Sequence, residues 1–302
     1  MIITVLRGGP SAEREVSLVS GAAVANGLRQ AGHAVYESDI APDNLAALDQ
    51  AAHRADVIFP VLHGSFGEDG QVQEILEQRK LPFVGSGSAA SRLGMDKAAT
   101  KRAWHAAGLP TPPYAVLTSQ TKSQWTQIGA PCAIKGLASG SSIDVFICKT
   151  PEEAIQAIDS ILARHAEVLV EKFIQGPELT VGLLEEQPLA PIRIVAKRAF
   201  FDYEAKYKAN DTEHRFDTGL PADVIETCRT LARDANAIVG ARDLARIDIM
   251  LDESAGFAPY LLEINTLPGF TPKSLLPEAA AHAGIPFPAL VDRLARRAAA
   301  RG

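Results

Sequence analysis

The sequence is poor in the features that mark several classes of protein. Its three cysteines, Cys132, Cys148 and Cys228, lie far apart without CxxC spacing, so neither a disulfide framework nor a structural zinc site is predicted, and a reducing compartment fits best. A formal net charge of −6 leaves no basic excess for a nucleic-acid surface. No apolar run approaches the ~20 residues of a membrane-spanning helix, and the N-terminal segment lacks the basic start and apolar core of a signal peptide. These absences predict a cytoplasmic protein whose partners are neither nucleic acids nor membranes.

What the sequence does contain is an ordinary globular composition in a chain long enough for several domains. It has 302 residues, of which 47% are hydrophobic and 22% are charged. A single core usually splits before a chain reaches this length, so two or three domains are expected. We predict an N-terminal unit over residues 1–92, a central unit over residues 93–178 and a C-terminal unit over residues 179–302.

Strand and helix signals alternate through the N-terminal unit. The predicted strands IITVL, HAVYESDI, DVIFPVLHG and LPFVGSG are separated by helical stretches, which indicates an α/β fold with a parallel sheet. In such sheets ligands bind beyond the carboxyl ends of the strands, where the loops GGPSAE and HGSFGEDG carry Glu13, His63, Glu68 and Asp69. A lone histidine is more often structural than functional, so these loops alone identify no ligand.

The later units combine helices with short strands. Asp96 is predicted to cap a helix over residues 96–108, and Pro151 is predicted to open a helix over residues 151–166. The segments ELTVGLLE and IRIVAKR are expected to be antiparallel strands. Two further helices are expected over roughly residues 222–240 and from about residue 287.

Two apolar segments near the C-terminus carry polar side chains on one face. ARIDIML and PYLLEIN, joined by the polar loop DESAGFA, are typical of a hairpin. Because side chains alternate along a strand, Arg246 shares a face with Asp248, and Glu263 shares one with Asn265. Pairing can bring Asp248, Glu263 and Asn265 together, and such oxygen ligands suit magnesium. The alternative is a solvated hairpin face, but the apolar flanking residues favour the metal site, because half-buried carboxylates need a partner.

Other segments place charge beside turns. In KGLASGSSID a strand ends at Lys135, and Ser141 and Ser142 follow in a loop that can approach a phosphate. This loop does not match the Walker pattern, and a flexible connection is the alternative. In VLVEKFIQGPELTV, Glu171 ends one strand and Glu178 begins the next, which by itself predicts two exposed carboxylates. The segment FFDYEAKYKAND is either a mobile loop that closes on a site or an ordinary exposed loop.

Taken together, these segments resemble the D-alanine–D-alanine ligases of the ATP-grasp superfamily. The resemblance covers nearly the whole chain, and any one segment is weak, whereas the ordered series is highly specific. The matching segments are GGPSAEREVSLVSG, HGSFGEDGQVQ, FVGSGSAAS, MDKAATK, GLPTP, GSSID, EKFIQGPELTV, DYEAKY, RIDIML and EINTLPGFTPKSL. The resemblance implies a three-domain ATP-grasp architecture of α/β class: an N-terminal parallel α/β domain, then two ATP-grasp domains with an antiparallel sheet in the C-terminal one.

The resemblance also implies an activity. Two D-alanines would be ligated to D-alanyl-D-alanine through a D-alanyl phosphate, with ATP between the second and third domains, for peptidoglycan precursor synthesis. Glu171 would read the adenine amine and Glu178 the ribose. The whole ATP-binding set would be Lys97, Lys135, Ser141, Ser142, Glu171, Lys172, Glu178 and Lys206. Two Mg²⁺ ions, or Mn²⁺ in their place, would be held by Asp248, Glu263 and Asn265.

The same resemblance assigns the amino-acid sites. Glu13 would bind the ammonium of the first D-alanine, and His63 would lie near its carboxylate. Ser274 and Leu275 would hold the carboxylate of the second D-alanine. A homodimer is also expected.

The resemblance further implies which groups act on the reacting atoms. Arg246 and the backbone N–H of Gly269 would form the oxyanion hole. Tyr207, hydrogen-bonded with Ser141 and Glu13, would position the closing loop and the amine. These five residues form the predicted catalytic set.

Three positions depart from the family pattern. Gly136 stands where a proline usually follows the lysine, Asp144 replaces the glycine of GSSxGV, and Glu74 stands where a glycine is usual. The charge of Asp144 is unfavourable if it points at phosphate. Glu74 is expected to be a surface feature.

Three other functions stay open on the sequence. They are a ligase that forms D-alanyl-D-lactate, another ATP-grasp carboxylate–amine ligase acting on different amino acids, and a nucleotide-binding protein without ligase activity. Tyr207 in DYEAKY resembles the dipeptide-forming loop and disfavours the first. The metal triad, Arg246 and both nucleotide lysines disfavour the last.

Overall fold

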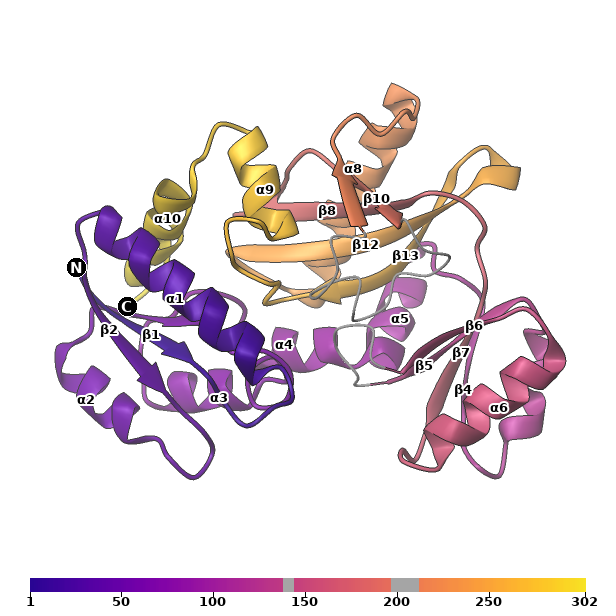
Figure 1. Ribbon diagram of the computed structural model, residues 1–302, viewed down its shortest axis with the longest axis horizontal. Helices are drawn as coiled ribbons and strands as arrows, with labels where there is room; N and C mark the ends of the chain where they lie inside the picture. Colours follow the sequence, from indigo (N-terminus) through magenta and orange to yellow (C-terminus); the bar gives the residue numbers. More distant parts are fainter. Residues whose placement is uncertain (138–143, 197–211) are drawn as a thin grey trace.

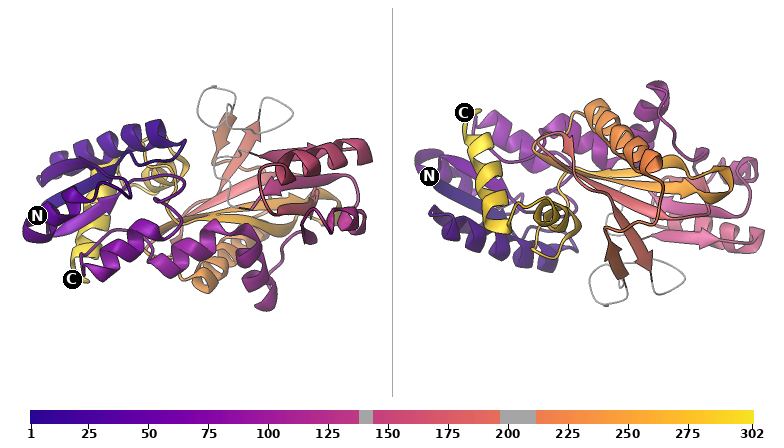
Figure 2. Two further views of the ribbon diagram at one scale, coloured as in Figure 1. Left: turned by 90° about the horizontal axis from the view of Figure 1, so that it is seen from below. Right: turned by 90° about the horizontal axis from the view of Figure 1, so that it is seen from above.

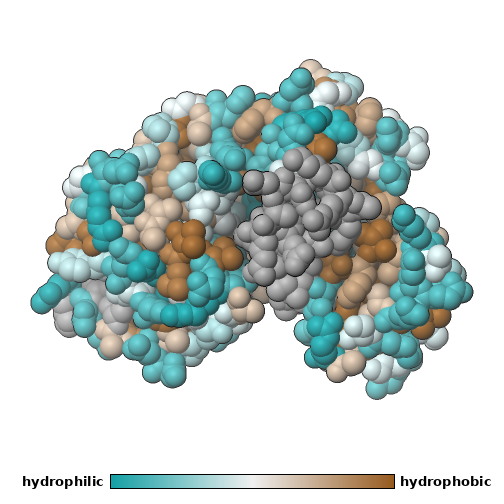
Figure 3. Space-filling view, viewed as in Figure 1, coloured by the Kyte–Doolittle hydropathy of each residue, from teal (hydrophilic) through white to brown (hydrophobic). Residues whose placement is uncertain are grey.

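Three sheets form the framework of the computed structural model, which describes residues 1–137, 144–196 and 212–302 (Figure 1). Seen from the face in Figure 3, the N-terminal unit and the unit of the central sheet stand apart along the lower edge, and the third unit joins them above. None of the helices in the described part of the chain combines the length and apolar character that a bilayer crossing requires.

The N-terminal sheet is parallel, as predicted. It contains β1 (Ile2–Arg7), β2 (Ala34–Asp39) and β3 (Val57–Pro60) in the order β2-β1-β3. The helices of this unit are α1 (Arg14–Gln30), α2 (Ala46–Arg54) and α3 (Gln71–Gln78). The fourth strand predicted at residues 81–87 is wrong: only Phe83 forms a bridge, with Ile58. The chain turns at Gly85, whose φ is +100°, and enters α4 (Ser88–Met95).

The central sheet is antiparallel, with the order β4-β7-β5-β6. Its strands are β4 (Tyr114–Leu117), β5 (Cys132–Gly136), β6 (Val145–Cys148) and β7 (Val168–Lys172). Asp96 caps α5 (Lys97–Ala106) by accepting from Ala99 N at 2.9 Å. Pro151 opens α6 (Pro151–Leu162) behind a Thr150–Glu153 capping box. Both predicted helix starts are therefore confirmed.

The C-terminal sheet has the order β11-β10-β8-β12-β13, with β9 (Gln187–Pro188) beside β8. Its main strands are β8 (Glu178–Leu184), β10 (Ile192–Ala196), β11 (Thr212–Arg215), β12 (Leu244–Asp252) and β13 (Ala258–Asn265). The helix α8 (Ala222–Val239) buries Leu231 and Ala235 against Val181 and Ile247. Alternation along the strands therefore directs the polar side chains of β8 and β12 to the opposite face.

The last two helices return to the N-terminal unit, beside which the last helix lies in Figure 2. They are α9 (Leu275–His282) and α10 (Phe287–Ala299). Leu290 and Leu294 of α10 share a core with Val24 and Leu28 of α1. The two ends of the chain thus stabilise one another, while the predicted domain ranges stay predictions.

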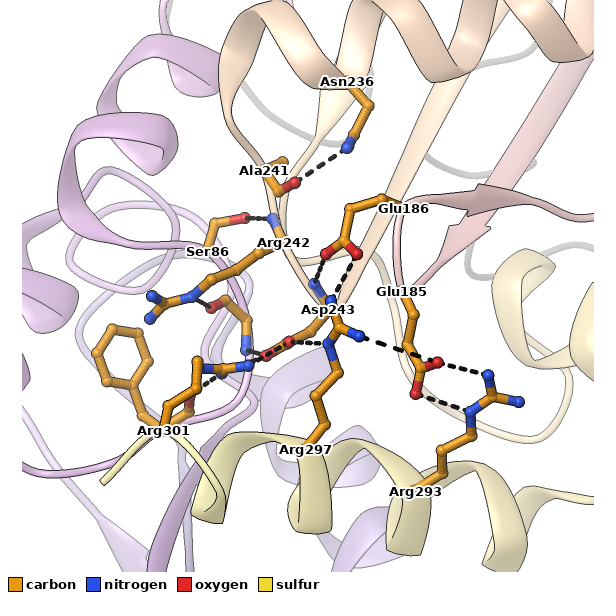
Figure 4. Close-up of polar contacts among 12 residues, drawn as sticks. Ser86, Glu185, Glu186, Asn236, Ala241, Arg242, Asp243, Arg293, Arg297 and Arg301 are labelled. Carbon is orange, nitrogen blue, oxygen red and sulfur yellow. Dashed lines mark hydrogen bonds and ion pairs between the residues drawn. The ribbon is translucent and has the colours of Figure 1, made fainter.

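An ionic cluster fastens this arrangement (Figure 4). Asp243 precedes β12 and is fully buried. Its carboxylate accepts from Gly85 N at 2.8 Å, from Arg297 Nε at 3.2 Å, and from both terminal nitrogens of Arg301 at 2.6 Å. Asp243 therefore joins the N-terminal unit, the third sheet and the end of the chain.

Arg301→Ala is expected to lower the free energy of unfolding by about 2–3 kcal/mol, because a buried carboxylate loses its bidentate partner while Gly85 and Arg297 remain. Urea denaturation followed by circular dichroism measures the change. Arg296→Ala is the control, because among the described residues that exposed arginine forms an ion pair only with Asp292, one helix turn away. Removing its side chain should cost under about 0.5 kcal/mol. Equal losses in the two variants would contradict the role of Asp243 as a junction.

Candidate active site

A cleft of about 880 Å³ lies between the central sheet and the C-terminal sheet. The predicted site residues that line it are Lys97, Lys135, Glu171, Lys172, Glu178, Asp248 and Glu263. Apolar side chains, among them Ile147, Phe173, Met250 and Leu262, complete its walls. Apolar walls with a few convergent charged groups are typical of a small-molecule binding site.

The pairing of β12 with β13 places the predicted metal ligands side by side. Asp248 lies opposite Glu263, and Arg246 lies opposite Asn265. Asn265 Nδ2 is 3.3 Å from Asp248 Oδ2, and Thr180 Oγ1 donates to Asp248 Oδ1 at 2.6 Å. The predicted hairpin and its shared polar face are confirmed.

The chemistry of these side chains fits a hard divalent cation. Within the described residues no group of three or more His, Cys, Asp or Glu side chains is placed to hold a metal ion, and the set here is two carboxylates and an amide. Turning the Asn265 amide over exchanges its NH₂ for an oxygen directed at the same point. Asp248 is 6% exposed, whereas the Glu263 side chain is 29% exposed and reaches the cleft. Oxygen donors of this kind are what magnesium prefers.

Arg246 donates two parallel hydrogen bonds to the carboxylate of Asp248. Its Nε and Nη2 donate to Asp248 Oδ1 and Oδ2 at 2.9 and 2.8 Å. The predicted sharing of a strand face is therefore confirmed. The bidentate contact holds the guanidinium plane in one orientation at the edge of the metal-ligand set.

The floor of the cleft contains a carboxylate between two lysines. Glu171 is 1% exposed, so the exposed strand end predicted from its position alone is wrong, because β7 lies inside the sheet between β4 and β5. Its Oε1 forms an ion pair with Lys101 Nζ, and its Oε2 with Lys135 Nζ. Burial alone raises the pKa of a carboxyl, but the two ammonium groups outweigh it and hold the pKa of Glu171 below its usual value.

The two lysines respond differently to that environment. Burial dominates at Lys101 and lowers its pKa despite the attraction of Glu171. At Lys135 burial also opposes the charge, but Glu171, Glu263 and Glu178 outweigh it and raise the pKa.

Lys101 is a site residue that the sequence reasoning missed. It lies four residues after Lys97 on α5, so the two side chains share a helix face. That spacing in MDKAATK was the available signal. A buried lysine nevertheless needs a buried carboxylate from a distant strand, and the sequence does not reveal that pairing.

The other nucleotide candidates surround this group. Lys97 Nζ lies 3.6 Å from Glu263 Oε2, which links α5 to β13. Lys172 ends β7, and Glu178 opens β8 opposite Met250 of β12. Glu178 is half-buried, so it too differs from the exposed carboxylate predicted at that strand end.

The two N-terminal loops meet beyond the parallel strands, as their position predicts. Glu13 is 7% exposed and His63 is 6% exposed. Ser11 Oγ accepts from Glu13 N at 3.1 Å and donates to the carbonyl of His63 at 2.5 Å. A Cβ on Gly64 would lie only 2.9 Å from Glu13 Oε2, so glycine permits this approach. His63 Nδ1 lies 3.4 Å from Glu68 Oε1, while its buried Nε2 has no hydrogen-bond partner within the described residues.

Gly269 and Ser274 are neighbours at the start of α9. A Cβ on Gly269 would lie 3.5 Å from Ser274 Oγ, and Ser274 immediately precedes Leu275, the first residue of the helix. Ser274 Oγ accepts from Thr271 N at 3.0 Å, which holds the turn. The first N–H groups of a helix favour an anionic partner such as a carboxylate.

Four predicted residues lie outside the described residues. They are Ser141, Ser142, Lys206 and Tyr207. The phosphate loop and the closing segment therefore stay predictions.

Two departures from the family pattern have a local explanation. Asp144 has a φ of +61°, a conformation that favours glycine, and its carboxylate pairs with Arg164 Nη2 at 2.8 Å and His165 Nε2 at 3.3 Å. Burial raises its pKa, but these partners outweigh it and hold the pKa of Asp144 below its usual value. Its charge is thus directed at the end of α6. Glu74 forms a half-exposed ion pair with Arg92, so the predicted surface role is confirmed.

Family models match most of the chain. A model described as "D-ala D-ala ligase C-terminus" matches residues 103–296, and one described as "D-ala D-ala ligase N-terminus" matches residues 37–86. Curated relatives named D-alanine–D-alanine ligase include that of Stutzerimonas stutzeri, 45% identical over 96% of this chain and 91% of the relative. That of Ectopseudomonas mendocina is 44% identical over 96% and 92%.

Solved structures are similar to this chain over its full length. The D-alanine–D-alanine ligase from Bacillus anthracis superposes with a TM-score of 0.87 and 32% identity, covering 100% of this chain and 98% of that one. A structure of the Bacillus anthracis protein complexed with ATP gives a TM-score of 0.85 and 29% identity over the same shares. The predicted ATP-grasp fold is confirmed by these neighbours.

Proposed function

The chain belongs to the D-alanine–D-alanine ligase family, and on that premise we propose that it joins two molecules of D-alanine to D-alanyl-D-alanine at the expense of ATP. The product serves peptidoglycan precursor synthesis. A cytoplasmic location and a homodimeric state are part of the proposal. ATP occupies the cleft between the central and C-terminal sheets.

One observation carries the proposal: β12 and β13 present Asp248, Glu263 and Asn265 on one face, beside a cleft whose floor contains Lys135 and Glu171. Phosphoryl transfer demands mainly that charge on the moving phosphoryl group be offset and that the reactants be held in line. Lys97 and Lys135 contribute positive charge to the same cleft. Glu171 and Glu178 are proposed to hold the adenine and the ribose, and Lys172 to assist at the adenine end.

Asp248, Glu263 and Asn265 would hold magnesium, which offsets the negative charge of the triphosphate when bound. The contribution of the chain is to direct two carboxylates and an amide at one place. Arg246 holds Asp248 from the side by its two hydrogen bonds. This keeps the carboxylate in one orientation.

The reaction has two steps. The carboxylate of the first D-alanine attacks the γ-phosphorus of ATP, which yields D-alanyl phosphate and ADP. The amine of the second D-alanine then attacks the acyl carbon, loses a proton and expels phosphate. Glu13 is proposed to bind the ammonium of the first D-alanine, with His63 near its carboxylate. Both are buried in the meeting place of the N-terminal loops, where a bound charge is poorly screened by water.

The second step needs donors for the oxygen that becomes negative. Arg246 and the N–H of Gly269 are proposed to supply them, and the start of α9 at Ser274 and Leu275 to hold the carboxylate of the second D-alanine. Preorganised donors of this kind are worth about 10²–10³ in rate in other enzymes. Ser141, Ser142, Lys206 and Tyr207 are proposed to cover the phosphates and exclude water, since acyl phosphates hydrolyse.

Product analysis tests the function. Purified protein incubated with D-alanine, ATP and Mg²⁺ is expected to release D-alanyl-D-alanine, ADP and phosphate in equal amounts, measured by chromatography and mass spectrometry. A reaction without D-alanine is the control. Competition between D-alanine and D-lactate at several pH values separates dipeptide formation from ester formation. Phosphate release at background with all substrates present contradicts the proposal.

A further inference from the structure

Lys101 is completely buried, and each of its three N–H donors has an acceptor. Its Nζ forms an ion pair with Glu171, donates to Thr111 Oγ1 at 2.8 Å and lies 3.4 Å from the carbonyl oxygen of Leu261. It also lies 5.9 Å from the ring centroid of Tyr114. Moving this side chain would leave three buried acceptors without their donor, so Lys101 stays where it is.

The fold holds Lys101 at this point. Lys97 and Lys101 are four residues apart on α5, a rise of about 6 Å, and Glu263 and Leu261 are two residues apart on β13, about 6.6 Å. The spacing of the two lysines on the helix therefore matches the spacing of their partners on the strand. Lys97 reaches the carboxylate of Glu263, and Lys101 reaches the carbonyl of Leu261.

Lys135 holds the same carboxylate from the other side, under different constraints. Its side chain is 13% exposed, it lines the cleft, and within the described residues its ion-pair partner is Glu171. A ligand that enters the cleft can reach this ammonium. Lys135 can therefore exchange Glu171 for another anion, whereas Lys101 cannot.

The carboxylate of Glu171, between the two lysines, is not accessible to solvent. Both oxygens of Glu171 are buried away from solvent, although the residue lines the cleft. Lys101 occupies the Oε1 side, and Lys135 occupies the Oε2 side. An adenine amine needs a carboxylate oxygen to accept its hydrogen bond, and Oε2 becomes available only when Lys135 withdraws.

Resting on the proposed function, we propose that these lysines have complementary roles, in which Lys101 is a permanent positioning residue for Glu171 and Lys135 is a removable cap that a polyphosphate draws away. The group carries two positive charges and one negative, and this excess attracts the polyphosphate. Once Lys135 has turned to phosphate, Glu171 accepts from the adenine amine while Lys101 keeps the buried carboxylate paired. Adenine is then read only on a nucleotide that carries phosphates, which favours ATP over adenosine.

Binding measurements on the full-length protein test this division of roles. Calorimetry measures the affinity for ATP, and an NMR titration measures the affinity for adenosine. Lys135→Met is expected to bind adenosine about tenfold more tightly than the wild type, because Oε2 is uncapped, and to bind ATP at least about tenfold more weakly. Lys101→Met is expected to bind both ATP and adenosine more weakly than the wild type. Arg102→Met, which removes the neighbouring exposed cation of α5, is the control and should change neither affinity.

The opposite signs distinguish this inference from a loss of folding or charge. Adenosine affinity that is unchanged or reduced in Lys135→Met would overturn the cap. Lys101→Gln is a second variant, which keeps a hydrogen-bond donor for Thr111. The positioning role would be overturned if either Lys101 variant bound ATP and adenosine with unchanged affinity. Failure of both variants to fold would also overturn it. If the wild-type protein does not bind ATP, that result would instead contradict the proposed function.

Discussion

Glu263→Gln is expected to lower the rate of D-alanyl-D-alanine formation by about 10³-fold while leaving the fold intact. The substitution keeps the size and shape of the side chain but removes one of the two negative charges that β12 and β13 direct at the proposed magnesium site. It also removes the partner that lies 3.6 Å from Lys97. Because the side chain is partly exposed, the free energy of unfolding should change by less than about 1 kcal/mol. Steady-state kinetics over a range of Mg²⁺ concentrations, with thermal unfolding alongside, measures both quantities.

Glu253→Gln is the matched control. Glu253 lines the same cleft, but it lies in the turn between β12 and β13 and has no place in the pairing of Asp248 with Glu263. Its rate should stay within about threefold of the wild type, in line with the small effects of surface changes. A rate near that of the wild type in Glu263→Gln would remove this residue from the metal site. A large loss in both variants would show that the cleft responds to charge in general.

Arg246→Ala is expected to reduce turnover by about 10²–10³-fold and to change the apparent affinity for ATP far less. The guanidinium is proposed to donate to the oxygen that becomes negative when the second amine attacks, and that charge is absent while ATP binds. Its bidentate contact with Asp248 presents it in one orientation. Measurement of kcat and of the KM for ATP and D-alanine separates the two effects.

Arg246→Lys gives the companion measurement. Lysine keeps the charge but cannot reproduce the fork that holds both oxygens of Asp248, so a partial loss is expected, between those of the wild type and the alanine variant. Thermal unfolding checks that Asp248 tolerates the change. Weaker ATP binding with an unaltered turnover number would assign Arg246 to the nucleotide rather than to the oxyanion.

Elements that depend on neighbouring residues could be predicted from the sequence. The alternation of ARIDIML and PYLLEIN requires Arg246 to share a face with Asp248, and Glu263 with Asn265, whatever surrounds the hairpin. Asp96 and Pro151 act on the helix turns that follow them directly. The polar face of each strand could therefore be predicted, but the pairing of Asp248 with Glu263 could not, because the register of the hairpin shifts between Asp248 and Ile249.

Other expectations failed where distant segments decide. The segment at residues 81–87 has the composition of a strand, but the turn at Gly85 limits it to one bridge. Glu171 stands at a strand end, which suggests exposure, yet the sheet order buries it between β4 and β5. Asp144 raised the possibility of repulsion at the phosphate loop, and only the positions of Arg164 and His165 show where its charge is directed.

The class of fold, the polar faces of the hairpin strands, the helix starts and the family resemblance could all be predicted, because each depends on period, capping or order along the chain. Three other features could be seen only in the folded chain: Lys101 and Lys135 share Glu171, α10 packs on α1, and Asp243 links the end of the chain to the third sheet. Those contacts join residues far apart in the chain, and a buried charge is tolerated only when such a partner reaches it. The identity of that partner depends on how sheets and helices pack, which local spacing does not encode.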